Sequence, residues 1–211
     1  KEPERAAEHL HRYLRLVPED SEALATLGLT RAEFAASPRE RLRAFMTLEN
    51  ALRRSPGRED VRRQLVDLAM ELRRLPDAVQ HLNNLIHATP NSAELEQLLG
   101  ECLEAQGKYS EAADSFERAI THDPHRVKSY EGLAGAWRRH LERPEEADLL
   151  MDRMIAANDR SFQAYVARAR YRQEFRLPSA AEDRERALEL AGEANLQDAD
   201  DLLAAAELAQ D

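Results

Sequence analysis

The side chains best suited to chemistry are seven histidines and a single cysteine, and their spacing argues against a reactive site. His122 and His125 are three residues apart, which is compatible with a zinc site. However, Pro124 interrupts the helix between them, and no thiolate or second histidine pair completes a tetrahedral ligand set. We interpret the pair as part of a solvated turn. Cys102 falls within an apolar helical stripe, so we expect a buried hydrophobic side chain rather than a reactive thiol.

Two acidic runs, Glu145-Glu146 and Glu182-Asp183, also have residue types that can act in catalysis. Arginines alternate with acids around the second run, so we expect it to form the solvent-facing side of a helix. The sequence has no glycine-rich phosphate loop, no nucleophile elbow and no serine or cysteine beside a base. We predict that the protein is not an enzyme and that it carries no metal and no cofactor.

The clearest structural pattern lies in residues 93–124, which read as two short amphipathic helices joined by a turn. Leu95, Leu99 and Leu103 form one apolar stripe, and Phe116 lies in the centre of a second. Gly107 is placed to end the first helix in a left-handed conformation. The spacing resembles the signature of a tetratricopeptide repeat through Leu99, Gly100, Gly107, Tyr109, Ala112, Phe116, Ala119 and Pro124.

The resemblance has two departures, Glu96 where the family often has tryptophan and Leu103 where it often has tyrosine. It implies an all-α fold, an α-solenoid in which antiparallel helical hairpins form a right-handed superhelix. Close packing explains the pattern, because Gly100 lets two helix backbones approach while Phe116 fills the space between them.

Proline positions support a 34-residue period, since Pro56, Pro90 and Pro124 are evenly spaced. Pro18 lies 38 residues before Pro56, so we expect about four extra residues to lengthen the helices around residues 31–37. We predict a single repeat array over residues 1–211. It comprises a half unit at 1–18, full units at 21–56, 59–90, 93–124, 127–158 and 161–191, and a last helix or cap at 195–210.

Composition agrees with an all-α protein and limits its partners. Hydrophobic residues make up 43% and aromatic residues only 5%, and alternating strand patterns are absent. No apolar run approaches the length of a membrane span. The net charge of −10 disfavours nucleic acid, and only residues 1–58 carry a positive balance, of +2. The preference for arginine over lysine suggests a bacterial, GC-rich source, and a start in mid-repeat suggests a segment of a longer protein.

The family resemblance implies that the first helix of each unit lines a concave groove. The candidate partner contacts carried over to this chain are Arg63, Asp67, Gln97, Glu101, Glu131, Arg138, Tyr165 and Arg172. One subfamily clamps a peptide's terminal carboxylate with a lysine and an asparagine. This clamp is absent here, because the matching pairs are Ala25/Leu29, Arg63/Asp67 and Gln97/Glu101. The acidic middle of the chain instead favours a partner with basic groups.

We therefore expect a non-catalytic protein–protein interaction scaffold that holds an extended peptide or a partner helix in its concave groove. The alternative is a structural spacer or oligomerisation arm of a larger polypeptide, for which self-association is expected. A catalytic domain elsewhere in a longer chain is a third alternative. An arginine cluster is interpreted as a solvated outer surface or as a dock for an acidic protein: Arg39, Arg41, Arg43, Arg53, Arg54, Arg58, Arg62 and Arg63.

Overall fold

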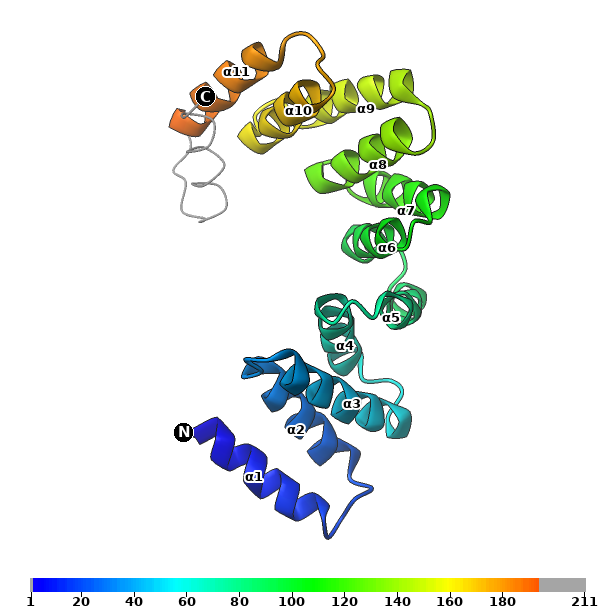
Figure 1. Ribbon diagram of the computed structural model, residues 1–211, viewed down its shortest axis with the longest axis vertical. Coiled ribbons are helices and arrows are strands. Elements are labelled where there is room, and N and C mark those ends of the chain that lie inside the picture. Colours follow the sequence, from blue (N-terminus) through cyan, green and yellow to red (C-terminus); the bar gives the residue numbers. More distant parts are fainter. Residues whose placement is uncertain (1, 194–211) are drawn as a thin grey trace. The chain divides into compact units, whose positions relative to one another are not determined.

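The computed structural model describes residues 2–193, which form eleven α-helices and no strand (Figure 1). The predicted last helix at 195–210 lies outside these residues. No helix among them combines the length and the hydropathy that crossing a bilayer requires. The chain divides into two compact units, residues 1–90 and 91–211, which are described separately below.

The first unit contains five helices. They are α1 (Glu2–Leu14), α2 (Ser21–Glu33), α3 (Pro38–Arg54), α4 (Glu59–Glu71) and α5 (Leu75–Ala88). The pairs α2/α3 and α4/α5 form helical hairpins, and α2 also contacts α4. The extra residues expected in this region lie in α3, which has 17 residues against 14 in α5, whereas α2 is not lengthened.

The second unit contains six described helices. They are α6 (Ala93–Ala105), α7 (Tyr109–His122), α8 (Val127–Arg139), α9 (Pro144–Ala157), α10 (Phe162–Glu174) and α11 (Ala180–Glu193). The first helices of successive hairpins contact one another, α6 with α8 and α8 with α10. The helices α7 and α9 make no comparable contact, so this unit curves with α6, α8 and α10 on its inner side (Figure 1). The predicted α-solenoid of helical hairpins is confirmed.

Local sequence explains where several helices begin and end. Ser37 and Glu40 form a capping box at the start of α3, in which each side chain accepts a backbone N–H. Gly107 follows α6 with φ of +76°, the left-handed conformation expected of it. Arg73, Glu142 and Arg176 adopt the same conformation after α4, α8 and α10 without the freedom of glycine.

The predicted packing role of Phe116 is confirmed in the second unit. Its side chain is buried, and the phenyl ring lies against two glycines on neighbouring helices. A Cβ atom on Gly100 of α6 would lie 2.7 Å from the ring, and one on Gly132 of α8 would lie 2.5 Å from it. One aromatic side chain therefore contacts the first helices of two successive hairpins.

The apolar spacing of Ala6, Leu10, Tyr13 and Leu14 predicts an inward stripe on the first helix, and this prediction is partly wrong. Leu14 is buried, but Ala6 and Tyr13 are exposed. Among the described residues, helix α1 packs mainly against α2. The neighbouring helix therefore covers a narrower face of α1 than is covered in a helix packed between two neighbours. The same correction applies to Leu42 and Leu188, which are 37% and 38% exposed at the edges of their stripes.

Candidate peptide-binding face

The inner side of the second unit brings together most of the side chains predicted to contact a partner. We define the inner face as the exposed or half-buried residues on α6, α8 and α10 that lie beside their buried stripes. Glu101 is on α6, Glu131 and Arg138 are on α8, and Tyr165 is on α10. Arg63 and Asp67 belong to the first unit, where both are exposed on α4.

Gln97 is buried and already has two hydrogen-bond partners, so it is not available to a partner protein as predicted. Its amide nitrogen donates to Glu101 at 2.7 Å. Its amide oxygen accepts from Arg126 at 3.1 Å. The residue therefore connects the start of α8 to α6 and fixes the position of the half-buried Glu101 carboxylate.

Two carboxylates of the inner face, Glu101 and Glu104, lie on α6, and a third, Glu131, lies on α8. Partial burial raises the pKa of Glu104 above its ordinary value, the positive charges of Arg139 and His140 oppose the rise, and the negative charge of Glu101 adds to it. The pKa of Glu131 is also raised, because surrounding atoms desolvate its carboxylate although the residue remains exposed. These carboxylates are therefore less well solvated than surface groups, which favours contact with a cation.

Arg138 was predicted to face a partner, but the structure engages it inside the unit. Its guanidinium donates to Tyr171 Oη at 2.9 Å and also to the Asp148 carboxylate. It lies 4.8 Å from the centre of the Phe175 ring. Tyr171 in turn donates to Asp148 at 2.6 Å, and burial together with this bond raises the pKa of the tyrosine. Arg138 thus links α8 to both α9 and α10.

Arg172 is likewise engaged within the unit. It donates to Asp183 at 2.8 Å and to Asp152 at 3.3 Å. Arg168, one turn earlier on α10, makes two bonds to Asp183 at 2.6 and 3.0 Å and one to Asp152 at 2.8 Å. Asp183 is only 3% exposed.

The expectation that Glu182-Asp183 forms the outer side of a helix is therefore wrong for Asp183. Its carboxylate lies at the start of α11 and accepts bonds from both arginines of α10. The signal that sequence reasoning missed is Arg168, which occupies the register position of the small residues Gly100 and Ala134 in earlier hairpins. An arginine at a close helix contact needs a carboxylate partner.

Tyr165 is half-buried beside a cluster of apolar side chains between α10 and α11. The cluster contains Phe162, Val166, Ala187 and Leu190. The Arg168 guanidinium lies 5.8 Å from the centre of the tyrosine ring. Of the inner-face residues on α10, Tyr165 is therefore the one that retains an aromatic surface for a partner.

The structure gives no metal-binding geometry to the candidate histidines. His122 ends α7 and His125 lies in the following turn, and both are exposed. Within residues 2–193, no three side chains of the metal-binding types come together.

The sequence of this chain matches the model of a known protein family. A family model described as a tetratricopeptide repeat matches residues 63–127 and, in an overlapping match, residues 98–161. The resemblance to the tetratricopeptide repeat is therefore confirmed, and the matched residues include the hairpin of residues 93–124 that carries it. No curated protein sequence is similar enough to be counted as a relative.

Several solved structures resemble the chain in fold. A MamA protein matches with a TM-score of 0.65 and 16% identity, over 75% of this chain and 84% of that one. A MamA fragment from Desulfovibrio magneticus RS-1 matches with a TM-score of 0.61 and 18% identity, over 74% and 86% of the two chains. YrrB, described as a TPR protein with an unusual peptide-binding site, matches with a TM-score of 0.63 and 22% identity, over 74% and 78%. At these identities the likeness shows the fold.

Proposed function

Residues 63–161 consist of tetratricopeptide repeats, and from this premise we propose that the protein is a non-catalytic interaction scaffold. Its second unit binds an extended peptide on the inner face of α6 and α8. The peptide carries basic side chains, which pair with Glu101, Glu104 and Glu131. The observation that carries the proposal is that Glu101 and Glu104 are half-buried one turn apart on α6 and repel each other, while the adjoining α8 carries Glu131.

Two arginines of α8 compensate this negative charge only in part, because each is also paired with another carboxylate. Arg138 is paired with Asp148, and Arg139 is paired with Glu174 at 2.8 Å. Lys128 and Arg170 lie near enough to moderate the charge at Glu131. A lysine or arginine of the peptide would relieve the remaining repulsion between Glu101 and Glu104.

The fold also supports binding in an extended form. Helices α6, α8 and α10 adjoin in succession, so their inner sides present a continuous surface. YrrB, which has a similar fold, is described as having a peptide-binding site. Tyr165 adds an aromatic contact beyond the carboxylates, which suits an apolar side chain next to the basic ones.

Fluorescence anisotropy with two labelled probe peptides tests the proposal. One probe alternates lysine and leucine, and the other replaces each lysine with glutamate. We expect the inner face to bind the lysine probe and not the glutamate probe, and we expect added salt to weaken the complex with the lysine probe. Replacing both Glu101 and Glu131 with glutamine should weaken binding by about threefold to tenfold, as expected for two partly exposed charge pairs.

Glu117→Gln is the matched control, because Glu117 is an exposed acid on α7 rather than on the inner face. It should leave the affinity for the lysine probe unchanged. An equal loss of affinity for the lysine probe in Glu117→Gln and in the double variant, or an affinity for that probe that does not respond to salt, would overturn the proposal. Sedimentation equilibrium of the same samples tests the rival role as a spacer or oligomerisation arm, which requires stable self-association without peptide.

A further inference from the structure

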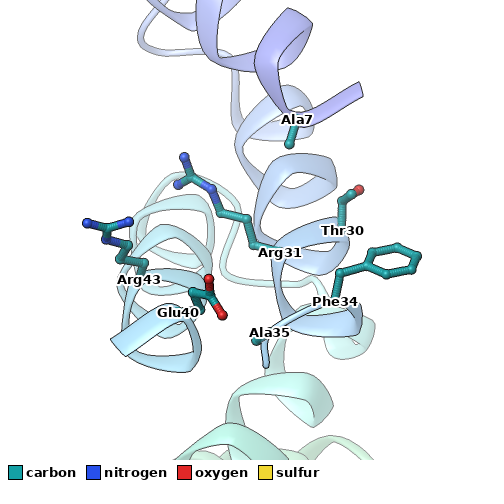
Figure 2. Close-up of a pocket in the computed structure, with 7 residues that line it drawn as sticks. All are labelled: Ala7, Thr30, Arg31, Phe34, Ala35, Glu40 and Arg43. Atoms are coloured by element: carbon teal, nitrogen blue, oxygen red, sulfur yellow. The ribbon is translucent and has the colours of Figure 1, made fainter. Parts of the chain in front are cut away.

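A pocket in the first unit contains two arginines that make no ion pair within the part of the chain that the structure describes. Its cavity measures about 230 Å³ and lies between α1, α2 and α3 (Figure 2). Arg31 comes from the end of α2 and Arg43 from the first half of α3. The described residues that line it are Ala7, Thr30, Arg31, Phe34, Ala35, Glu40 and Arg43.

Arg31 stands where the repeat pattern normally places an apolar residue. The equivalent positions in later hairpins are Leu103, Trp137 and Tyr171, spaced by 34 residues. Arg31 is half-buried, and its guanidinium donates to the Thr47 hydroxyl at 3.0 Å. Because a hydroxyl carries no charge, this bond leaves the cation without a counter-ion.

Arg43 brings a second positive charge to the same pocket. Burial of Arg31, followed by repulsion from Arg43, lowers the pKa of the Arg31 guanidinium. Glu40 also lines the pocket, but its carboxylate accepts the backbone N–H groups of Ala36 and Ser37, both at 3.0 Å. Among the described residues of the lining, Glu40 supplies one carboxylate, which caps α3 and also attracts Arg43, against two guanidinium groups, so these residues carry a net positive charge.

The second unit contains a matched pocket in which the chain supplies the missing anions. This cavity of about 170 Å³ lies among α9, α10 and the segment before α11. Its two arginines, Arg168 and Arg172, share Asp152 and Asp183. In this pocket, two carboxylates neutralise the two guanidinium groups. None of the described residues that line the first pocket takes the place of Asp183.

We propose that the pocket of Arg31 and Arg43 binds an acidic peptide from a partner protein. One aspartate or glutamate side chain lies between the two guanidinium groups, which supply charge-assisted hydrogen bonds. Figure 2 shows Arg31, Arg43 and Glu40 on one side of α2 and Phe34 on the other. Phe34 is 54% exposed, so a neighbouring apolar side chain of the peptide packs against its ring. This site goes beyond the proposed function, since it lies in the other unit and selects the opposite charge.

The test is an NMR titration of the whole chain, labelled with ¹⁵N in its arginine side chains. The probe is the peptide acetyl-Gly-Phe-Glu-Phe-Gly-amide, and its glutamine and phosphoserine versions are the comparison arms. We expect the Nε–H signals of Arg31 and Arg43 to shift to saturation with the glutamate probe. The glutamine version should bind at least about tenfold more weakly, because it lacks the charge that both arginines recognise.

Two variants decide whether the pocket is responsible. Arg43→Gln changes an exposed residue, so it should leave the fold intact and weaken binding of the glutamate probe by about tenfold. Arg31→Gln should have the same effect, with folding checked by circular dichroism. Arg39→Gln is the matched control, because Arg39 is exposed on α3 but does not line the pocket.

Several results would overturn the proposal. They are equal binding of the glutamate and glutamine probes, an equal loss in Arg39→Gln and Arg43→Gln, and tighter binding of the phosphoserine version. Inorganic phosphate alone is a further arm, and shifts as large and as tight as those with the peptide would exclude a peptide site. Arg43→Gln should not change the affinity for the lysine probe, so failure here is separable from failure of the inner-face proposal.

Discussion

The phenyl ring of Phe116 on α7 lies directly against Gly132 on α8. A Cβ atom built on Gly132 would lie 2.5 Å from the ring's Cζ atom, closer than two carbon atoms can pack. The ring also lies against Gly100 of its own hairpin, so it joins one hairpin to the next. This contact shows why the hairpins are interdependent, since each completes its core against the following one.

The first prediction concerns this contact. Gly132→Ala should lower the free energy of unfolding by about 1–3 kcal/mol, because the added methyl group overpacks the buried ring. The loss should exceed the gain of up to about 1 kcal/mol that alanine brings to a helix interior. Urea denaturation followed by circular dichroism measures the change. Gly192→Ala on α11 is the control, because no atom of the described residues lies within 4 Å of its Cβ position, and it should be neutral or stabilising.

The second prediction concerns the ion network of α10 and α11. Asp183→Asn should destabilise the second unit by about 3–5 kcal/mol, because it leaves Arg168 and Arg172 without their most buried counter-charge. Thermal and urea unfolding measure the loss. Glu182→Gln changes the adjacent exposed acid and should stay within about 0.5 kcal/mol of the parent. Equal effects of the two variants would show that Asp183 is not the buried partner of the arginines.

The third prediction concerns pH. Burial raises the pKa of Glu104 above its ordinary value. At any pH between these two pKa values, the folded chain therefore binds more protons than the unfolded chain. This carboxyl therefore lowers the free energy of unfolding as pH rises through that window. Glu104→Gln should be more stable than the parent at pH 7, and the difference should vanish at a pH below the ordinary value. Urea titrations at several pH values measure it, and a constant difference would contradict the burial effect.

The fourth prediction concerns Cys102. Burial raises the pKa of its thiol to about 11, with a further rise from the charge of Glu101. Only a minute fraction is thiolate at neutral pH, so the native chain should react far more slowly with a thiol reagent such as DTNB than the chain unfolded in urea. Stopped-flow absorbance measures both rates, and comparable rates would show that the thiol is accessible and ionised in the fold.

Several features were predictable from the sequence because they depend on nearby residues. The left-handed turn at Gly107 and the end of α7 before Pro124 follow from backbone conformations that few residues adopt. Burial of Leu99 and Phe116 follows from helical periodicity. Ala147 lies one residue later than the 34-residue period places it, which predicts a longer turn before its helix, and the connection of residues 140–143 is one residue longer than that of residues 106–108.

The candidate site was less predictable. The family resemblance placed Arg138 and Arg172 on the inner side, yet Asp148 and Asp183 engage both arginines within the unit. Gln97, predicted as a partner contact, is bonded to Arg126 from the start of the next hairpin. A long polar side chain can reach several neighbours, and neither helical periodicity nor residue type says which neighbour it meets.

The sequence by itself determined the helical hairpins, their period and their buried stripes, because helix length, turn conformation and apolar spacing are encoded within a few residues. Only the tertiary structure decided which charges are neutralised inside the protein and which remain for partners. Asp183 meets Arg168 across 15 residues of chain, while Arg31 and Arg43 share a pocket in which the one carboxylate of the described lining caps α3. Such pairings depend on how helices pack and where flexible side chains end, which local sequence does not specify.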